Sequence, residues 1–277
     1  MFFNICIRIL LMSICLFCKS EGVFRTKEHI IPESLGNDTE IIENVICEKC
    51  QNYFGREIEK PALEKTNLAI WRTYLGIRTK KKKLPSVNLD PPTRGVIPSF
   101  HPMTEYGIGF TAWEDGSTSL DMHNPLKKRS FLNDKSEYIL VITPWHLSIL
   151  GRFLGKMGLE LLALTDINYA LSSEFDEMRS FVRFGNTKHL WPIYCGQRGR
   201  VDELKSPITW DGFKGSQKID CYCYSLGKRI TGETLFAFSM GTDDMLICLN
   251  HSLPKPDYEE SLVGVKLSCI HYPDGKW

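Results

Sequence analysis

Two cysteine pairs with the spacing C-x-x-C are the most specific chemical signal in this sequence. The first pair is Cys15 and Cys18, the second is Cys47 and Cys50, and 28 residues lie between the pairs. Four thiolates at this spacing can close one tetrahedral zinc site from two knuckles. Buried free thiols or disulfides are the alternatives. We expect structural zinc, because paired spacings like this are a specific zinc signature. The metal would supply much of the folding energy of a module of about fifty residues, which has too little core to be stable alone.

Side chains suited to hydrolysis of a phosphodiester lie between and beside the two pairs. Glu28 and His29 are adjacent, Asn44 precedes the second cysteine pair and Gln51 follows it. An imidazole can accept a proton from water near neutral pH. Carboxylate and amide oxygens suit a hard cation such as Mg²⁺ or Mn²⁺, which would stabilise charge on the phosphorane. Taken singly, His29 could be a core histidine and Asn44 a helix N-cap.

The elements that must position these residues form a ββα pattern. An apolar strand carries His29, the turn Leu35-Gly36-Asn37-Asp38 follows, and a second short strand precedes Asn44. A helix opens at the second cysteine pair. Glu33 and Ser34 are expected to shape the turn. The joint placement of these residues between two knuckles favours a functional interpretation over the separate structural ones.

This pattern resembles the zinc-bearing branch of the HNH endonucleases over about residues 12–60. The resemblance implies that His29 is the general base, Glu28 ligates a divalent catalytic ion and Asn44 orients the base. An Asn or His directly after the last cysteine completes the metal site in that family. Here that position is Gln51, with Asn52 next along the chain. Gln51 carries the same amide oxygen on a longer arm, whereas Asn52 points about 100° round the helix.

The resemblance implies a metal-dependent nuclease with two kinds of ion. Zinc would be structural, and Mg²⁺ or Mn²⁺ catalytic. The substrate would be nucleic acid, with double-stranded DNA as the expected partner, and a role in restriction or phage defence would follow from the family. The alternative is a catalytically weak or inactive zinc module that binds nucleic acid or protein without cutting.

Charge is distributed unevenly along the chain. The formal net charge is +1, but residues 1–83 hold 14 Lys and Arg against 10 Asp and Glu, and the rest hold 20 against 23. A basic end that coincides with the motif suits contact with a phosphate backbone. The candidate contacts are Arg56, Lys60, Lys80, Lys81, Lys82 and Lys83. Solvated surface charge is the alternative for each of them.

The first residues superficially resemble a signal peptide, and we reject that interpretation. No basic cluster opens the segment, Arg8 interrupts its apolar run, and cleavage near residue 20 would remove Cys15 and Cys18. We expect residues 1–11 to be an upstream extension with Met12 as the start. The apolar stretch is too short and interrupted to span a bilayer comfortably. The expected location is cytoplasmic.

The expected fold class is α+β. Residues 12–66 would form the nuclease module, residues 67–95 a helix and a basic, proline-rich linker, and residues 96–277 a second α+β domain with a mostly antiparallel sheet. Pro61 is expected to stop a short helix, and Ala62 to Ile77 reads as helical. No motif assigns a role to the second domain.

Two helices and several strands are expected after residue 96. A helix begins at Thr143-Pro144, with leucines and Met157 on one stripe and Arg152, Lys156 and Glu160 on the opposite face. A second helix runs from Ser172 or Ser173 to Gly185. The expected strands are 106–113, 137–143, 189–195, 218–224, 233–238, 245–249 and 263–270.

Overall fold

The computed structural model describes residues 12–37, 39–78, 81–83, 86–89, 108–112, 118–122, 144–185, 191–197, 222–241, 243–252 and 268–270. Helices and strands are mixed throughout this part of the chain, as the α+β expectation requires. The expected upstream extension at residues 1–11 and the expected strand 137–143 lie outside it.

The N-terminal module is a ββα unit preceded by a small knuckle. Strand β1 (Ser13–Ile14) pairs with β2 (Glu21–Gly22), and β3 (Lys27–His29) pairs with β4 (Ile41–Glu43), both antiparallel. A single 3-10 turn, η1 (Glu33–Leu35), lies in the connection between β3 and β4. Helix α1 (Glu48–Phe54) begins after Cys47, which confirms the expected ββα order.

Pro61 does not stop the helix, contrary to the expectation. A π-helical turn, η2 (Gly55–Glu59), follows α1 directly, and α2 (Lys60–Lys65) continues from it with Pro61 in its first turn. Proline lacks an N–H and clashes with the carbonyl four residues earlier, but the first turn of a helix tolerates it. The widened π turn separates that first turn from α1. Helix α3 (Asn67–Tyr74) follows, with Thr66 as its N-cap.

A three-stranded sheet follows α3. Strands β5 (Ser86–Leu89), β6 (Ile108–Ala112) and β7 (Thr118–Met122) pair in antiparallel order, and α2 and α3 contact β5. Strand β6 was expected, but β5 lies where a linker was expected and β7 was missed. The short polar sequences Ser-Val-Asn-Leu and Thr-Ser-Leu-Asp-Met give a weak alternation signal, and their pairing with β6 supplies the missing stabilisation.

The long helix α4 (Pro144–Thr165) is the centre of the structure. It begins at Pro144 as expected, and two short helical segments, α5 (Ile167–Ala170) and η4 (Ser173–Phe175), lead to α6 (Asp176–Phe184). Gly185 closes α6 with φ of 67°, a conformation that favours glycine. Close packing also depends on Gly158, where a Cβ would lie 2.8 Å from Leu249.

A five-stranded antiparallel sheet covers one side of α4. Its spatial order is β12-β8-β11-β10-β9, formed by β8 (Ile193–Gln197), β9 (Tyr222–Lys228), β10 (Thr234–Met240), β11 (Asp243–Cys248) and β12 (Ser268–Ile270). Each of these strands overlaps an expected strand, with bounds shifted by a few residues. The antiparallel arrangement is confirmed.

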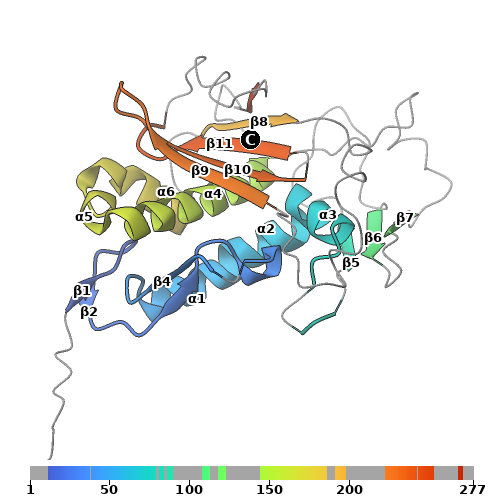
Figure 1. Ribbon diagram of the computed structural model, residues 1–277, viewed down its shortest axis with the longest axis horizontal. Coiled ribbons are helices and arrows are strands. Elements are labelled where there is room, and N and C mark those ends of the chain that lie inside the picture. Colours follow the sequence, from blue (N-terminus) through green and yellow to red (C-terminus); the bar gives the residue numbers. More distant parts are fainter. Residues whose placement is uncertain are drawn as a thin grey trace, which may run out of the picture.

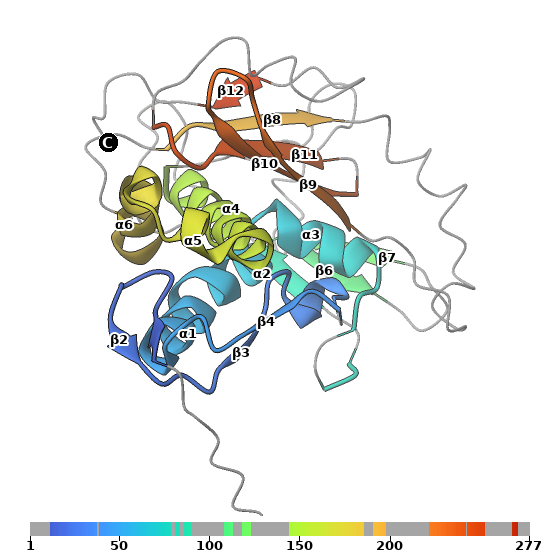
Figure 2. The same cartoon turned by 60° about the vertical axis from the view of Figure 1, so that its left-hand side comes forward.

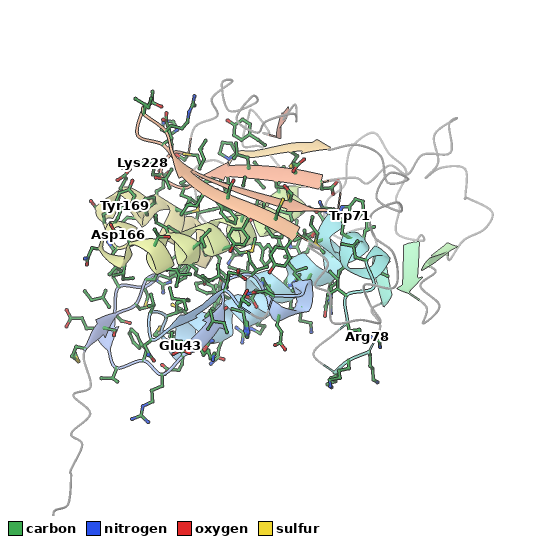
Figure 3. All side chains as sticks on the ribbon, viewed as in Figure 1. Glu43, Trp71, Arg78, Asp166, Tyr169 and Lys228 are labelled. Carbon is green, nitrogen blue, oxygen red and sulfur yellow. The ribbon has the colours of Figure 1, made fainter. Side chains whose placement is uncertain are left out.

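Helix α4 lies between this sheet and the N-terminal module, as Figures 1 and 2 show from two directions. Side chains fill the space between the layers (Figure 3). One continuous apolar core contains Cys15 and Phe54 of the module, Phe153 of α4 and Phe236 of the sheet. Burial extends to the polar side chains of the middle of α4, which are Arg152, Lys156 and Glu160, so this part of the helix is covered on more than one stripe. Leu164, at the end of the expected leucine stripe, is 51% exposed. The expected division into a module and a second domain stays a prediction.

Within the part of the chain that is described, the helices are too short or too polar to cross a lipid bilayer.

Candidate active site and metal centre

The four cysteine sulfurs lie together. Cys15, Cys18, Cys47 and Cys50 each place a sulfur within 4.8 Å of the other three. Cys15 and Cys18 come from the turn after β1, and Cys47 and Cys50 flank the start of α1. The Sγ atoms of Cys18 and Cys47 are 3.6 Å apart, well beyond the length of a disulfide bond. The arrangement is that of a four-cysteine metal site.

The thiols also have the electrostatics of a metal site. The side-chain hydrogen bond from Cys50 lowers the pKa of Cys15 to about 4, against the opposing effect of burial. The Cys15 Sγ also accepts a hydrogen bond from the backbone N–H of Cys47 at 3.3 Å. Burial raises the pKa of Cys47. Crowded thiols resist joint ionisation, and a bound dication such as Zn²⁺ removes that resistance by replacing their protons. The four sulfurs therefore fit the expected structural zinc ion.

Hydrogen bonds connect the hairpin to these knuckles. The hydroxyl of Thr26, just before β3, donates to the carbonyl of Ile46 at 2.5 Å, and the N–H of Asn44 donates to the carbonyl of Thr26 at 3.0 Å. Leu16 in the first knuckle donates its N–H to the carbonyl of Val45 at 2.9 Å. A metal that fixes the knuckles therefore also fixes the hairpin, which carries the candidate catalytic residues.

Glu28 and His29 point to opposite faces of β3. Successive residues of a strand alternate between faces, and here Glu28 is buried whereas His29 is half-buried. Lys27, two residues before His29, shares its face and is exposed, and its Nζ lies 3.4 Å from Glu43 on β4. The imidazole and an ammonium group are therefore neighbours along the solvent-facing side of the hairpin, about 7 Å apart at the backbone. Lys27 was missed in the sequence, although strand alternation could have found it.

Asn44 lies at the turn between β4 and α1. Its backbone has φ of 62°, a left-handed conformation that asparagine tolerates well, and its side chain is exposed. Its N–H donates to the carbonyl of Thr26, which is three residues, or about 10 Å, along the strand from His29. The role of Asn44 in orienting the base stays a prediction.

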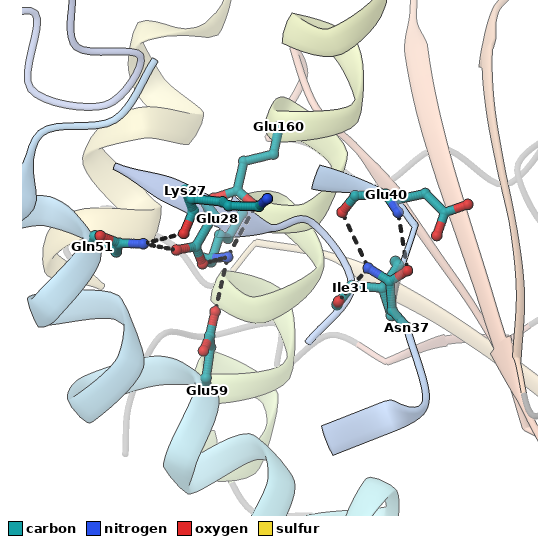
Figure 4. A network of polar contacts seen from close by, with 9 residues as sticks. Lys27, Glu28, Ile31, Asn37, Glu40, Gln51, Glu59 and Glu160 are labelled. Atoms are coloured by element: carbon teal, nitrogen blue, oxygen red, sulfur yellow. Dashed lines mark hydrogen bonds and ion pairs between the residues drawn. The ribbon is translucent and has the colours of Figure 1, made fainter. Parts of the chain in front are cut away.

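Asn37 is a second residue that sequence reasoning missed. Its side chain is buried in the β3–β4 connection, where its amide donates to the carbonyls of Ile31 at 2.7 Å and Glu40 at 3.1 Å. Its Oδ1 accepts the backbone N–H of Thr39 at 2.9 Å and of Glu40 at 3.0 Å. Figure 4 shows Asn37 between Ile31 and Glu40. This network fixes the end of the hairpin directly after His29. In the sequence, an asparagine directly after a glycine indicates only a turn.

Glu28 belongs to a buried charge cluster that reaches across to α4. The ammonium of Lys156 lies 2.8 Å from Oε1 of Glu28, 2.9 Å from Oε2 of Glu160 and 2.9 Å from Oε1 of Glu59. The contacts with Glu28 and Glu160 are also hydrogen bonds. Figure 4 shows Glu28, Glu59 and Glu160, which come from β3, η2 and α4, converging on this point. Lys156 and Glu160 are fully buried.

The pKa values in the cluster follow from burial and mutual charge. Burial alone would lower the pKa of Lys156, but the three carboxyl groups outweigh it and raise that pKa well above its usual value. Burial would raise the pKa of Glu28, but the charge of Lys156 and hydrogen bonds from Lys156 and Gln51 outweigh it and lower that pKa. Burial raises the pKa of Glu160 well above the usual range, although Lys156 opposes the shift. Glu28 and Lys156 therefore form the charged pair of the cluster, and Glu160 favours its protonated form.

Gln51 faces Glu28 with its amide N–H groups. Its Nε2 donates to Oε2 of Glu28 at 2.7 Å and to the carbonyl of Lys27 at 2.8 Å. Asn52, the other expected amide ligand, is exposed on the next position of α1. The structure thus brings Glu28 and Gln51 together and leaves Asn52 outside. Gln51 places its amide N–H group, not its amide oxygen, beside the carboxylate of Glu28.

The Glu28 position does not fit a divalent ion in this arrangement. A metal at Glu28 would have to share both carboxylate oxygens with donors, because Lys156 donates to one oxygen and Gln51 to the other. The buried ammonium would also repel a second cation at this carboxylate.

The candidate nucleic-acid contacts lie on two segments. Arg56 in η2 and Lys60 in α2 are exposed, and Arg56 lies 2.5 Å from Glu57. Lys81, Lys82 and Lys83 are exposed after α3, and the carbonyl of Lys82 accepts a hydrogen bond from Arg78 at 2.9 Å. Lys80 lies outside the described residues. Contact of these side chains with nucleic acid stays a prediction.

Comparison with known families agrees with the geometry of the module. Residues 15–67 match the family model described as HNH endonuclease. The match includes all four cysteines, the β3–β4 hairpin and α1, and ends at the first residue of α3. No curated protein and no solved structure matches the chain.

Proposed function

We propose that this protein is an endonuclease that hydrolyses phosphodiester bonds of DNA at the solvent-facing side of the β3–β4 hairpin. The observation that carries the proposal is the half-buried His29 on a hairpin clamped by four metal-binding sulfurs, within a segment that matches the HNH endonucleases. The family match supports nuclease chemistry in general. The choice of DNA and of His29 as the base belongs to the proposal.

In this proposal His29 removes the proton from the water whose oxygen attacks phosphorus. The bond from phosphorus to the leaving sugar oxygen then breaks, and that oxygen takes a proton from solvent water. A positioned histidine is suited to that task because its charge changes near neutral pH. Asn37 acts as a positioning residue, since its four hydrogen bonds to backbone groups hold the chain directly after His29. Lys27 contacts the phosphate from the same face of β3 and stabilises developing negative charge. A zinc ion on the four sulfurs would keep the hairpin and the knuckles in place.

Exposed basic side chains support DNA as the substrate. Arg56 and Lys60 follow α1, and Lys81 to Lys83 follow α3, so both groups are available to phosphates. Such contacts provide affinity without sequence information. A role in restriction or defence against phage is consistent with the family and belongs to the same proposal.

A second candidate function is a zinc module that binds nucleic acid without cutting it. The ion pair between Glu28 and Lys156 favours this candidate, because it occupies the carboxylate on which a catalytic ion would be expected. The two candidates share the zinc site and the basic surface. They differ in whether His29 performs chemistry.

A plasmid-nicking assay separates the two candidates. The zinc-loaded protein is incubated with supercoiled DNA in Mg²⁺, in Mn²⁺ and without either ion, and His29→Ala is compared with His251→Ala as a control distant in sequence. We expect the wild type and the control to nick and His29→Ala to lose activity by about 100-fold or more. Nicking that survives in His29→Ala would refute the assigned base. DNA binding without nicking by the wild type would favour the second candidate.

A further inference from the structure

Lys156 is a buried cation on an element outside the family match. It comes from α4, 128 positions after Glu28, and its side chain has 0% exposed surface. An isolated ammonium at such depth would lose most of its hydration, so it requires acidic partners. The three carboxyl groups within 2.9 Å meet that requirement. The contacts with Glu28 and Glu160 are hydrogen bonds, and the contact with Glu59 is an ion pair.

These partners come from three separate elements. Glu28 lies on β3 of the hairpin, Glu59 ends the π turn η2, and Glu160 lies one turn after Lys156 on α4. Oxygens that converge from several elements on one buried point are the usual surroundings of a hard metal ion. Here a lysine nitrogen lies at that point. Oε1 of Glu160 is buried without a hydrogen-bond partner among the described residues, which leaves acceptor capacity around the nitrogen.

We propose that Lys156 is the resident cation of the Glu28 site and takes the place of a divalent ion there, so that the zinc-loaded protein binds no second metal on Glu28. The inference rests on the proposed function only in placing the chemistry of the hairpin on the His29 face. On the opposite face of β3, Glu28 then forms an internal ion pair with Lys156 that attaches the hairpin to α4.

Removal of the ammonium should turn the cluster into a metal site. Lys156→Met keeps an unbranched side chain of similar length but removes the positive charge. Glu28, Glu59 and Glu160 then surround a position without a cation, where their oxygens can bind Mn²⁺. The expected gain in Mn²⁺ affinity is on the order of 100-fold, because the repulsion of one nearby unit charge is removed.

Mn²⁺ binding by the full-length, zinc-loaded protein tests the proposal directly. The free Mn²⁺ signal in electron paramagnetic resonance is recorded during titration of the wild type, Lys156→Met and Lys65→Met. Lys65 is exposed on α2 and serves as the matched control. We expect stoichiometric Mn²⁺ binding only in Lys156→Met, and its loss when Glu28→Gln is added. Binding by the wild type that Glu28→Gln abolishes would overturn the proposal.

A further variant covers the case in which Lys156→Met does not fold. The double variant Lys156→Gln with Glu160→Gln replaces the ammonium and one carboxyl group by amides. The carboxyl groups of Glu28 and Glu59 remain. It should fold and gain Mn²⁺ binding relative to Glu160→Gln alone; a folded double variant without that gain would contradict the proposal.

The outcomes for this inference and for the proposed function are distinguishable, because DNA cleavage does not enter the Mn²⁺ measurement. A wild type that nicks DNA and binds Mn²⁺ on Glu28 would refute the assignment of Lys156 as resident cation and leave the proposed function intact. A wild type that fails to nick DNA and binds no Mn²⁺ would refute the proposed function and leave the assignment of Lys156 intact.

Discussion

The ammonium nitrogen of Lys156 lies 2.8 Å from Oε1 of Glu28, although the two residues are 128 positions apart. The contact attaches the strand beside the candidate base to the central helix of the molecule. It determines what the hairpin can bind on its buried face and how the module responds to changes in α4.

Loss of the Lys156 charge should destabilise the folded protein. Removing one member of a buried ion pair leaves the other charge uncompensated and costs about 3–5 kcal/mol. Lys156→Met should therefore unfold at lower urea concentration than the wild type at about pH 8. A free energy of unfolding equal to that of the wild type would contradict the ion-pair assignment.

The pH dependence of this stabilisation has a defined sign. The pKa of Lys156 is raised in the folded protein above the usual 10.5, so its contribution is fully present below pH 10.5. The contribution is lost as pH rises through the higher folded value. The difference in free energy of unfolding between the wild type and Lys156→Met should thus stay constant from about pH 8 to 10 and shrink at higher pH. A difference that grows as pH rises toward 10.5 would show that the shift has the opposite sign.

Disruption of the sulfur cluster should unfold the module. Cys47→Ser removes one of four zinc ligands, and structural zinc supplies about 10–16 kcal/mol of apparent binding free energy in small modules. Zinc content should fall and limited proteolysis should cleave within residues 15–67. Cys223→Ser, an exposed thiol on β9, is the matched control and should leave both unchanged. Retention of one zinc per chain by Cys47→Ser would refute the assignment of four cysteine ligands.

Asn37→Ala should weaken the hairpin. The substitution removes five hydrogen bonds and takes a donor from the buried carbonyl of Ile31, at a cost of about 1–3 kcal/mol if that carbonyl stays unsatisfied. Urea unfolding should report the loss, and nicking should fall because the chain after His29 is no longer fixed. Asn52→Ala, on the exposed side of α1, should change stability by less than about 0.5 kcal/mol. Equal effects of the two substitutions would remove the positioning role of Asn37.

Lys27→Gln should reduce affinity for DNA without unfolding the protein. An exposed lysine that contacts one phosphate contributes to counterion release. In Lys27→Gln the slope of log K against log salt concentration should therefore become smaller in magnitude by about one. Filter binding or fluorescence anisotropy at several salt concentrations measures the slope. Lys49→Gln, at an exposed lysine of α1, provides the comparison. An unchanged slope in Lys27→Gln would place the DNA elsewhere.

The local part of the site could be predicted from the sequence. The cysteine spacing predicted the sulfur cluster, and strand periodicity placed His29 on the hairpin, because both depend on residues close in the chain. Regular hydrophobic patterns likewise predicted α4, α6 and the antiparallel sheet. The expectation that Pro61 stops a helix was wrong, since the effect of a proline depends on where the surrounding turns begin.

The contacts of Glu28 could not be predicted from local patterns. Lys156 and Glu160 were assigned to a polar face opposite the leucine stripe, but the buried apolar residues Ile149 and Ala163 lie on that same face. A helix that is apolar on several sides is generally buried on all of them. That signal indicated burial of Lys156 but not its partners, which are determined by tertiary packing of α4 against β3 and η2.

The packing of α4 against the module has a consequence for any shortened form of the protein. A fragment that ended at residue 66 would keep all four sulfurs, His29 and almost the whole family match. It would lose the lysine that neutralises Glu28 and the apolar surface on which α1 and η2 rest. Such a fragment should load zinc and still aggregate or lose its hairpin geometry, because the module and α4 share one continuous apolar core.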